Sequence, residues 1–161
     1  MKRLALVLAL ALLAGPAAAR DALGVYDGWG AFRDAAPPRC FAIAEPVRKG
    51  HANWRPFAAV SHWPLQRIRG QVHVRLSREK RAGAAVTLGI DARRFPLVAG
   101  GADAWAPDPG TDAAIVAAMR SGRSMSISTV AANGAGFADT YMLKGAATAI
   151  DAAALGCARG R

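Results

Sequence analysis

The three histidines are the first residues whose type could do chemistry, because imidazole binds metal ions and transfers protons near neutral pH. They lie at positions 51, 62 and 73, and none forms an H-x-x-x-H or H-E-x-x-H pair or lies beside a cysteine. This spacing gives no support to a zinc site. His73 falls on the polar side of an alternating segment, so we interpret it as a surface residue.

A nucleophile, a base and an acid can be picked out as Ser61, His62 and Asp139. Ser61 and His62 are neighbours in an expected strand, however, and neighbouring strand residues point to opposite faces. They should therefore not hydrogen-bond as nucleophile and base. The G-x-S-x-G elbow of many hydrolases is also missing from the sequence. These observations argue against a serine hydrolase.

Acidic residues gather around the start of one expected helix, at Asp103, Asp108 and Asp112. Turn and helix-start roles account for all three, and the D-x-D-x-D-G order of a calcium loop is absent. The glycines are scattered at expected turns and form neither a phosphate-binding loop nor a dinucleotide fingerprint. We therefore expect a protein that is not an enzyme and that binds no cofactor or metal.

The sequence contains two cysteines, Cys40 and Cys157. In an oxidising compartment an even number of cysteines favours a disulfide, and two cysteines allow a single intramolecular pairing. Two free buried thiols are the alternative. The disulfide would join the expected strand around Cys40 to the C-terminal segment.

The N-terminus predicts such a compartment. Met1-Lys2-Arg3 is a cationic start, residues 4–13 form an unbroken apolar run, and residues 17–19 are alanines that fit signal-peptide cleavage. The run is about half the ~20 residues of a spanning helix, which disfavours a membrane anchor. We expect a signal peptide at 1–19 and a single β-rich domain at 20–161, exported to the periplasm or to the cell surface, or secreted.

The expected mature chain is strongly basic. Without Lys2 and Arg3 it has 19 Lys and Arg against 11 Asp and Glu residues, a formal net charge of +8. Such a surface attracts anions, and for an exported protein these are envelope components or surface proteins rather than nucleic acid. The abundance of Arg, Ala and Gly has a second explanation, a GC-rich genome. The candidate contacts of a basic face are Arg67, Arg69, Arg75, Arg78, Lys80 and Arg81.

Alternating apolar and polar residues predict short strands, most clearly at 71–77. Helices are expected at about 111–121, with Thr111 as N-cap and Gly122 as C-cap, and at about 146–158. Residues 20–28 and 47–56 are expected to be loops, with Trp54 and Trp105 as core or lid packing or as an exposed binding edge. The expected strands are 29–33, 39–44, 57–63, 71–77, 85–90, 95–98, 124–130 and 136–143. Strands and helices do not alternate regularly, so the fold class is mostly β, an antiparallel β-sandwich or barrel-like sheet with two short helices.

Four segments of the second half carry a family pattern, at 95–108, 112–122, 124–129 and 137–157. The most specific part is D-T-Y-x-L-x-G, formed by Asp139, Thr140, Tyr141, Leu143 and Gly145. Trp29, Cys40 and residues 60–64 extend the similarity into the first half. The chain resembles the invasion-associated locus B family of small exported bacterial proteins. The resemblance implies a β-rich periplasmic or surface protein of a virulence-associated family, and it implies no catalytic residues.

The D-T-Y segment itself has a simpler interpretation. Thr140 and Tyr141 suit a strand, whereas Asp139 is a poor strand former that we expect to accept hydrogen bonds from turn amides at 133–136. We therefore interpret the motif as structural.

Three functional hypotheses remain. The first is non-catalytic binding of an envelope or host-surface partner through a basic face. The second is a periplasmic module that binds or inhibits an envelope enzyme, with binding that survives high salt. The third is a small envelope hydrolase that uses His62, Asp103 or Asp139, and the lack of paired acid–base residues makes it the least favoured.

Overall fold

A computed structural model describes residues 20–48 and 55–158 of the chain. The expected signal peptide, His51 and Trp54 lie outside these ranges. The described strands are β1 (Arg20–Tyr26), β2 (Trp29–Asp34), β3 (Arg39–Ala44), β4 (Phe57–Trp63), β5 (Ile68–Arg75), β6 (Val86–Ile90), β7 (Arg93–Gly100), β8 (Asp103–Trp105), β9 (Ser124–Val130) and β10 (Gly136–Met142). The described helices are α2 (Pro109–Ser121) and α3 (Ala146–Ala158).

The strands form one antiparallel sheet of ten strands in the order β1-β2-β3-β4-β5-β8-β7-β6-β9-β10. The three-residue strand β8 pairs with β5 on one side and with β7 on the other, so it joins the two halves of the sheet. The outermost strands β1 and β10 are not paired with each other in the described chain, and the sheet stays open. The expected mostly β, antiparallel fold with two helices is confirmed.

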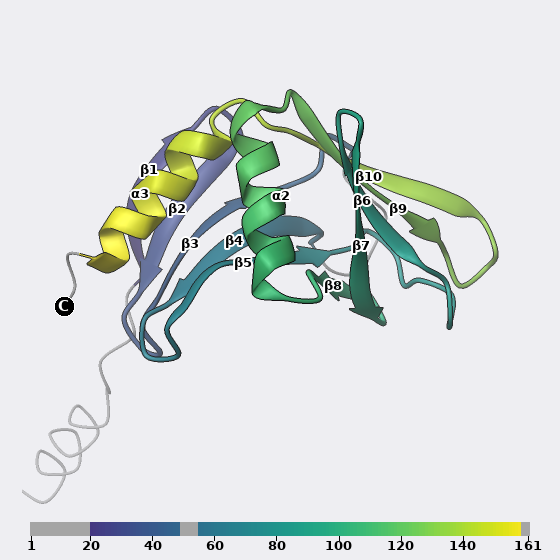
Figure 1. The fold of residues 1–161 in the computed structure, drawn as a ribbon, viewed down its shortest axis with the longest axis horizontal. Coiled ribbons are helices and arrows are strands. Elements are labelled where there is room, and N and C mark those ends of the chain that lie inside the picture. The colour runs from purple at the N-terminus through teal and green to yellow at the C-terminus, as the bar shows by residue number, and fades with distance from the viewer. Residues whose placement is uncertain (1–19, 49–54, 159–161) are drawn as a thin grey trace, which may run out of the picture.

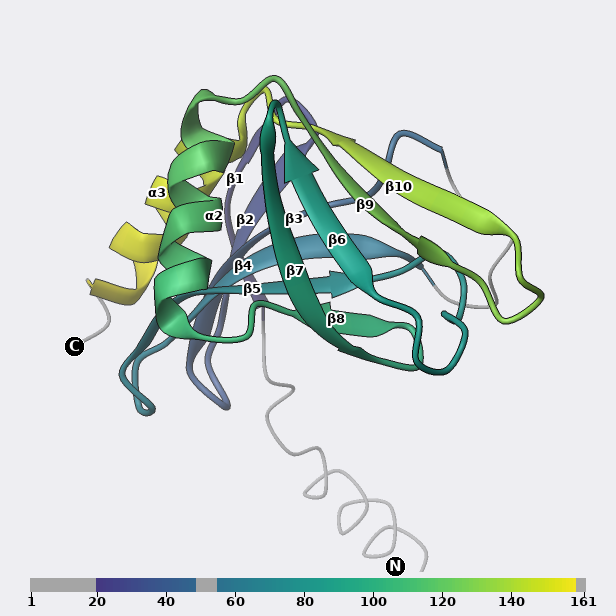
Figure 2. The same cartoon turned by 45° about the vertical axis from the view of Figure 1, so that its right-hand side comes forward.

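The sheet is strongly bent, so its two halves run in different directions and enclose the core (Figures 1 and 2). Apolar side chains from both halves meet there, including Val72 and Val74 of β5, Leu88 of β6 and Ile127 of β9. Helix α3 packs on β1, β2 and β3, and α2 packs on β5. The two helices lie together on one side of the sheet (Figure 1), joined by the ion pair of Arg120 with Asp151 at 2.6 Å.

The expectation of a loop at residues 20–28 is wrong, because residues 20–26 form the edge strand β1. Tyr26 pairs with Trp29 across the two-residue turn Asp27-Gly28, and Asp27 has a φ of 54°. An Asp-Gly pair is a standard hairpin signal. A β-bulge between residues 22 and 24 interrupts the apolar–polar alternation of β1, which hides the strand in the sequence.

The start of α2 also differs from expectation. Its N-cap is Asp108, not Thr111, because the Asp108 carboxylate accepts the backbone N–H of Thr111 at 2.8 Å. Gly122 is the C-cap as predicted. Asp112 does more than favour the helix start, since it is buried and its Oδ1 accepts the backbone N–H of Val72 at 2.7 Å. This bond fixes α2 to β5.

The predicted disulfide between Cys40 and Cys157 is confirmed, with the two Cα atoms 5.7 Å apart. It ties the C-terminal end of α3 to β3 across a sequence separation of 117 residues. The chain before α3 is also fixed, since the indole N–H of Trp29 in β2 donates to the carbonyl of Met142 at the end of β10 at 2.8 Å. The segment that contains α3 is therefore held between this hydrogen bond and the disulfide.

Candidate functional site

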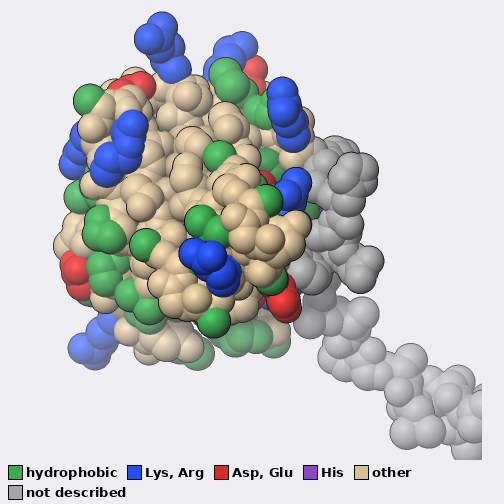
Figure 3. All heavy atoms as spheres, turned by 90° about the vertical axis from the view of Figure 1, so that its right-hand side faces the viewer, with side chains coloured by type: hydrophobic (Ala, Val, Ile, Leu, Met, Phe, Trp, Pro, Cys, Tyr) green, Lys and Arg blue, Asp and Glu red, His purple; other side chains and the backbone are tan. Residues whose placement is uncertain are grey.

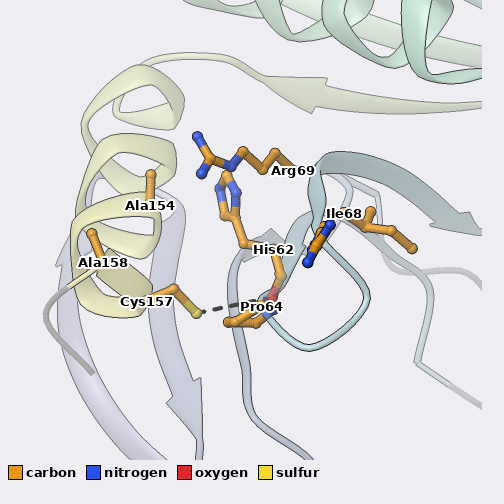
Figure 4. Close-up of a pocket in the computed structure, with 8 residues that line it drawn as sticks. His62, Pro64, Ile68, Arg69, Ala154, Cys157 and Ala158 are labelled. Atoms are coloured by element: carbon orange, nitrogen blue, oxygen red, sulfur yellow. Dashed lines mark hydrogen bonds between the residues drawn. The ribbon is translucent and has the colours of Figure 1, made fainter. Parts of the chain in front are cut away.

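A pocket of about 440 Å³ lies between the β4–β5 hairpin and the C-terminal half of α3. We call it the β4–β5 pocket. Its polar lining comes from the hairpin, as His62, Arg67 and Arg69, and its apolar lining comes from both sides (Figure 4). Among the described residues the lining is His62, Pro64, Arg67, Ile68, Arg69, Ala154, Cys157 and Ala158.

The pairing of β3, β4 and β5 explains why these residues meet. Cys40 of β3 lies directly opposite His62 of β4, so the disulfide and the imidazole share one region of the sheet. The sulfur of Cys157 lies 4.0 Å from the carbonyl oxygen of His62. The pairing of β4 with β5 shifts register at His62, and Gly70 beside the shift has a φ of 75°. Such β-bulges re-aim the side chains next to them.

His62 is one of two described residues with a buried side-chain polar atom that lacks a hydrogen-bond partner, the other being Tyr141. Its Nε2 atom is buried and has no hydrogen-bond partner among the described residues. Burial lowers the pKa of His62 below its usual range, and the nearby positive charge of Arg69 lowers it further. The imidazole is therefore neutral at pH 7 and offers one N–H donor and one nitrogen acceptor. Figure 4 shows the Arg69 guanidinium lying over this ring, toward Ala154.

Both arginines of the pocket are exposed, and neither has an ion-pair partner among the residues that the structure describes. Arg67 has a φ of 57°, a backbone conformation that favours glycine. The other described non-glycine residues with positive φ are Asp27 and Asp91, a residue type that tolerates this region. An arginine held in a sparsely populated conformation is a feature that clusters at functional sites.

The six basic residues singled out from the sequence do not gather at one place. Arg67 and Arg69 lie at the start of β5, whereas Arg78, Lys80 and Arg81 follow its other end. Eight residues of extended strand separate the two groups by roughly 25 Å. The second group lies against the β9–β10 hairpin, where the N–H of Arg81 donates to the carbonyl of residue 130. On the face drawn in Figure 3 the Lys and Arg side chains are also spread as separate groups.

The sixth residue, Arg75, belongs to a different cluster on β5 and β8. Its guanidinium makes two 3.1 Å hydrogen bonds to the Asp103 carboxylate, which also bonds His73 Nε2 at 2.8 Å. Burial alone would raise the pKa of Asp103, but the bonds from Arg75 and His73 outweigh it and lower the pKa. The ring of His73 stacks on Trp105, with centroids 4.9 Å apart. The positive charge of Arg75 is thus neutralised locally, and His73 is half-buried rather than a free surface residue.

The D-T-Y-x-L-x-G segment, residues 139–145, lies where β10 meets the rest of the core. Tyr141 and Leu143 are buried, and Thr140 is exposed with its carbonyl accepting the N–H of Val47 at 2.8 Å. Gly145 has a φ of 84°, and a Cβ there would lie 2.0 Å from the Tyr26 carbonyl oxygen. Four of these five positions therefore have packing or backbone roles.

Asp139 is the remaining member of the motif, and its expected role is wrong. Its carboxylate is buried and accepts the backbone N–H of Ser77 at 2.8 Å, rather than the amides of the 133–136 turn. The side chain of Asn133 takes the turn role, accepting the N–H of Ala135. Asp139 faces inward because it shares a side of β10 with Tyr141, whose buried hydroxyl has no partner among the described residues.

The residues considered for hydrolysis have separate environments. His62 lines the β4–β5 pocket, Asp103 bonds Arg75 and His73, and Asp139 bonds Ser77. Among residues 20–48 and 55–158, no group of three or more His, Cys, Asp or Glu side chains is placed to hold a metal ion. In the same ranges no helix has the length and apolar character needed to cross a membrane.

The sequence singles out His62, Arg67, Arg69 and Cys157 for unrelated reasons, and it does not show that they line one pocket. The register that places Cys40 opposite His62 is set by strand pairing, and the bulge that turns Arg69 toward His62 has no reliable sequence pattern. Gly70 directly after Arg69 was the one available signal, since an isolated glycine in a strand often marks a bulge.

Comparison with known proteins gives no relative: no protein-family model, no curated protein and no solved structure matches this chain.

Proposed function

We propose that this is an exported, non-catalytic protein that binds an anionic component of the bacterial envelope through the β4–β5 pocket. The observation that carries the proposal is the pair Arg67 and Arg69 beside the unsatisfied Nε2 of His62, with no acidic residue among the described residues of the pocket lining. Two guanidinium groups without a described ion-pair partner, and the imidazole in the tautomer protonated at Nε2, all donate hydrogen bonds, and an anion is the ligand that accepts them.

Export is supported by three features of different kinds. The N-terminus has the pattern of a signal peptide. The Cys40–Cys157 disulfide is the type of linkage that persists in oxidising compartments, so it is compatible with an extracytoplasmic location. The resemblance to the invasion-associated locus B family, carried mainly by Asp139–Gly145, implies the same location.

The backbone of Arg67 supports a functional role for its side chain. A non-glycine residue at positive φ costs on the order of 1 kcal/mol, and glycine at this position would remove most of that cost. The turn that ends with the hydrogen bond from the N–H of Arg67 to the carbonyl of Pro64 sets this backbone conformation, so the side chain is free to serve a role other than fold stability. Binding of an anion is the contribution that its charge and its exposed position at the pocket suggest.

The test compares two charge-reversal variants that change the net charge equally. One replaces Arg67 and Arg69 by Glu, and the matched control replaces Arg78 and Arg81 by Glu. Binding is measured by sedimentation with isolated native envelopes and with phosphatidylglycerol vesicles, at low and at high salt. We expect the first variant to lose at least about tenfold in affinity at low salt and the control to lose much less, because an anionic surface attracts each nearby cation by ~1 kcal/mol.

Two outcomes would overturn the proposal. An equal loss of affinity in both variants would mean that binding depends only on the net charge. No loss of affinity in either variant would mean that these basic residues do not take part in binding. Binding that survives high salt and both variants would instead favour the alternative function, a module that binds an envelope enzyme or another soluble protein. A single Arg67→Gly variant guards against misfolding, since we expect it to keep its stability and still bind more weakly.

A further inference from the structure

We infer that the ligand of the β4–β5 pocket is an amphiphile with one anionic head group, a carboxylate or a phosphate, on a short apolar chain. This inference rests on the proposed function and specifies the ligand class. It follows from the division of the lining into a cationic part and an apolar part. The cationic part is Arg67, Arg69 and His62, and the apolar part is Pro64, Ile68, Ala154, Ala158 and the disulfide.

The apolar part is unusual for a site that would bind only a free inorganic anion. Helix α3 contributes only alanine methyl groups and a disulfide sulfur to the pocket, with no hydrogen-bond donor from a side chain. The hairpin adds the Pro64 ring and the half-exposed Ile68. An apolar chain laid on this surface would remove it from water, which is favourable in proportion to the apolar area covered.

The volume fits a small amphiphile. A cavity of about 440 Å³ lies toward the lower end of the ~300–1,000 Å³ range of small-molecule sites. Inorganic phosphate or acetate would fill only a small part of it.

His62 gives the head group its specificity. The Nε2 atom is buried and has no partner in the part of the chain that the structure describes, and a buried polar group in that state is unfavourable until a ligand supplies its hydrogen bond. The exposed Arg69 side chain covers the imidazole in Figure 4, and no described ion pair holds it there. A head group that bonds both the Arg69 guanidinium and the His62 N–H satisfies both groups at once.

Calorimetric titration of the purified, disulfide-bonded protein separates the parts of this inference. The probes are acetate and inorganic phosphate as head groups alone, octanoate and octyl phosphate as amphiphiles, and octyl glucoside as an uncharged amphiphile, each below its micellar concentration. We expect the amphiphilic anions to bind at least about tenfold more tightly than the head groups alone and than octyl glucoside. Comparing octanoate with octyl phosphate distinguishes a carboxylate source from a phosphate source.

Three variants locate the binding. Arg69→Gln should lower the affinity for octanoate and for octyl phosphate about tenfold. His62→Phe should lower the affinity for whichever of these two ligands binds more tightly by about twofold to tenfold. Ala154→Met should fill the apolar part of the pocket and lower the affinities for octanoate and octyl phosphate to those for acetate and phosphate.

The inference is overturned if octanoate and octyl phosphate bind no better than acetate and phosphate, if octyl glucoside binds equally well, or if Arg69→Gln has no effect. The proposed function is judged separately by the envelope assay with the two charge-reversed pairs. If the variant with Arg67 and Arg69 replaced by Glu loses envelope binding, but the octyl probes bind no better than acetate and phosphate, the amphiphilic ligand is refuted. The proposal of an anionic partner is then retained.

Discussion

Reduction of the Cys40–Cys157 disulfide should cost this protein a large part of its stability. The bridge closes a loop with a sequence separation of 117 residues. The chain-entropy relation for such a loop gives about 5 kcal/mol at 25 °C, and bridges of this kind commonly contribute about 2–4 kcal/mol. Since whole domains of this size are stable by only about 5–15 kcal/mol, the reduced protein should lie near its limit of stability.

Urea denaturation followed by circular dichroism measures this effect on one and the same sequence. With an m-value of about 2 kcal/mol/M, a loss of 2–5 kcal/mol moves the midpoint down by about 1–2.5 M in the reduced protein. A Cys40→Ala/Cys157→Ala double variant, measured with and without reductant, controls for effects of the reductant itself. A midpoint shift below about 0.5 M on reduction would contradict this prediction, because it would mean that the disulfide does not restrict the unfolded chain enough to affect stability.

The remaining predictions concern single buried or strained positions and are read by the same urea assay. Gly145→Ala should lower the free energy of unfolding by more than about 3 kcal/mol, because the new methyl group would clash with the Tyr26 carbonyl. Gly134 has a similar positive φ but open space around it, so Gly134→Ala should lower the free energy of unfolding by only about 1 kcal/mol. Equal losses in the two variants would contradict the clash at Gly145. Asp139→Ala should lower the free energy of unfolding by about 1–3 kcal/mol, because the backbone N–H of Ser77 loses its hydrogen-bond acceptor. Asp139→Asn keeps an acceptor oxygen and should lower it less. An unchanged urea midpoint for Asp139→Ala would contradict the assigned bond. Burial raises the pKa of Asp112 above its ordinary 3.8, so the folded state binds its proton more readily, and stability is lost as pH rises from about 4 through the raised pKa. Asp112→Asn should therefore stabilise the protein at pH 7 and have little effect below pH 4, and an effect independent of pH would contradict this.

The strands with regular alternation could be predicted from the sequence. Residues 124–130 place Met125, Ile127 and Thr129 on one side, and these three are buried in β9 with the bounds expected. Alternation works there because the strand has one core face and one solvent face. It fails for β8, whose three residues are too few to show a period, and for β1, whose bulge breaks it.

The site was predictable only in part, because separation along the sequence differs from separation in the folded chain. Neighbouring basic residues along 67–81 suggested one basic face, but an extended strand carries the chain away from its start, so Arg69 and Arg81 end at opposite ends of β5. Conversely, His62 and Cys157 are far apart in the sequence and meet through strand pairing and the disulfide. Asp139 shows the same limit, since its partner Ser77 belongs to another part of the chain.

The most direct test of the central claim, that an anion binds in the β4–β5 pocket, is a titration of the ¹⁵N-labelled protein followed by amide chemical shifts. The probe is short-chain phosphatidylglycerol below its micellar concentration, with inorganic phosphate as a second probe. We expect the largest shifts at residues 62–69 of the hairpin and at 154–158 of α3, with the turn at 78–81 much less affected. Shifts that are largest at 78–81, or that are spread evenly over the basic surface, would contradict it.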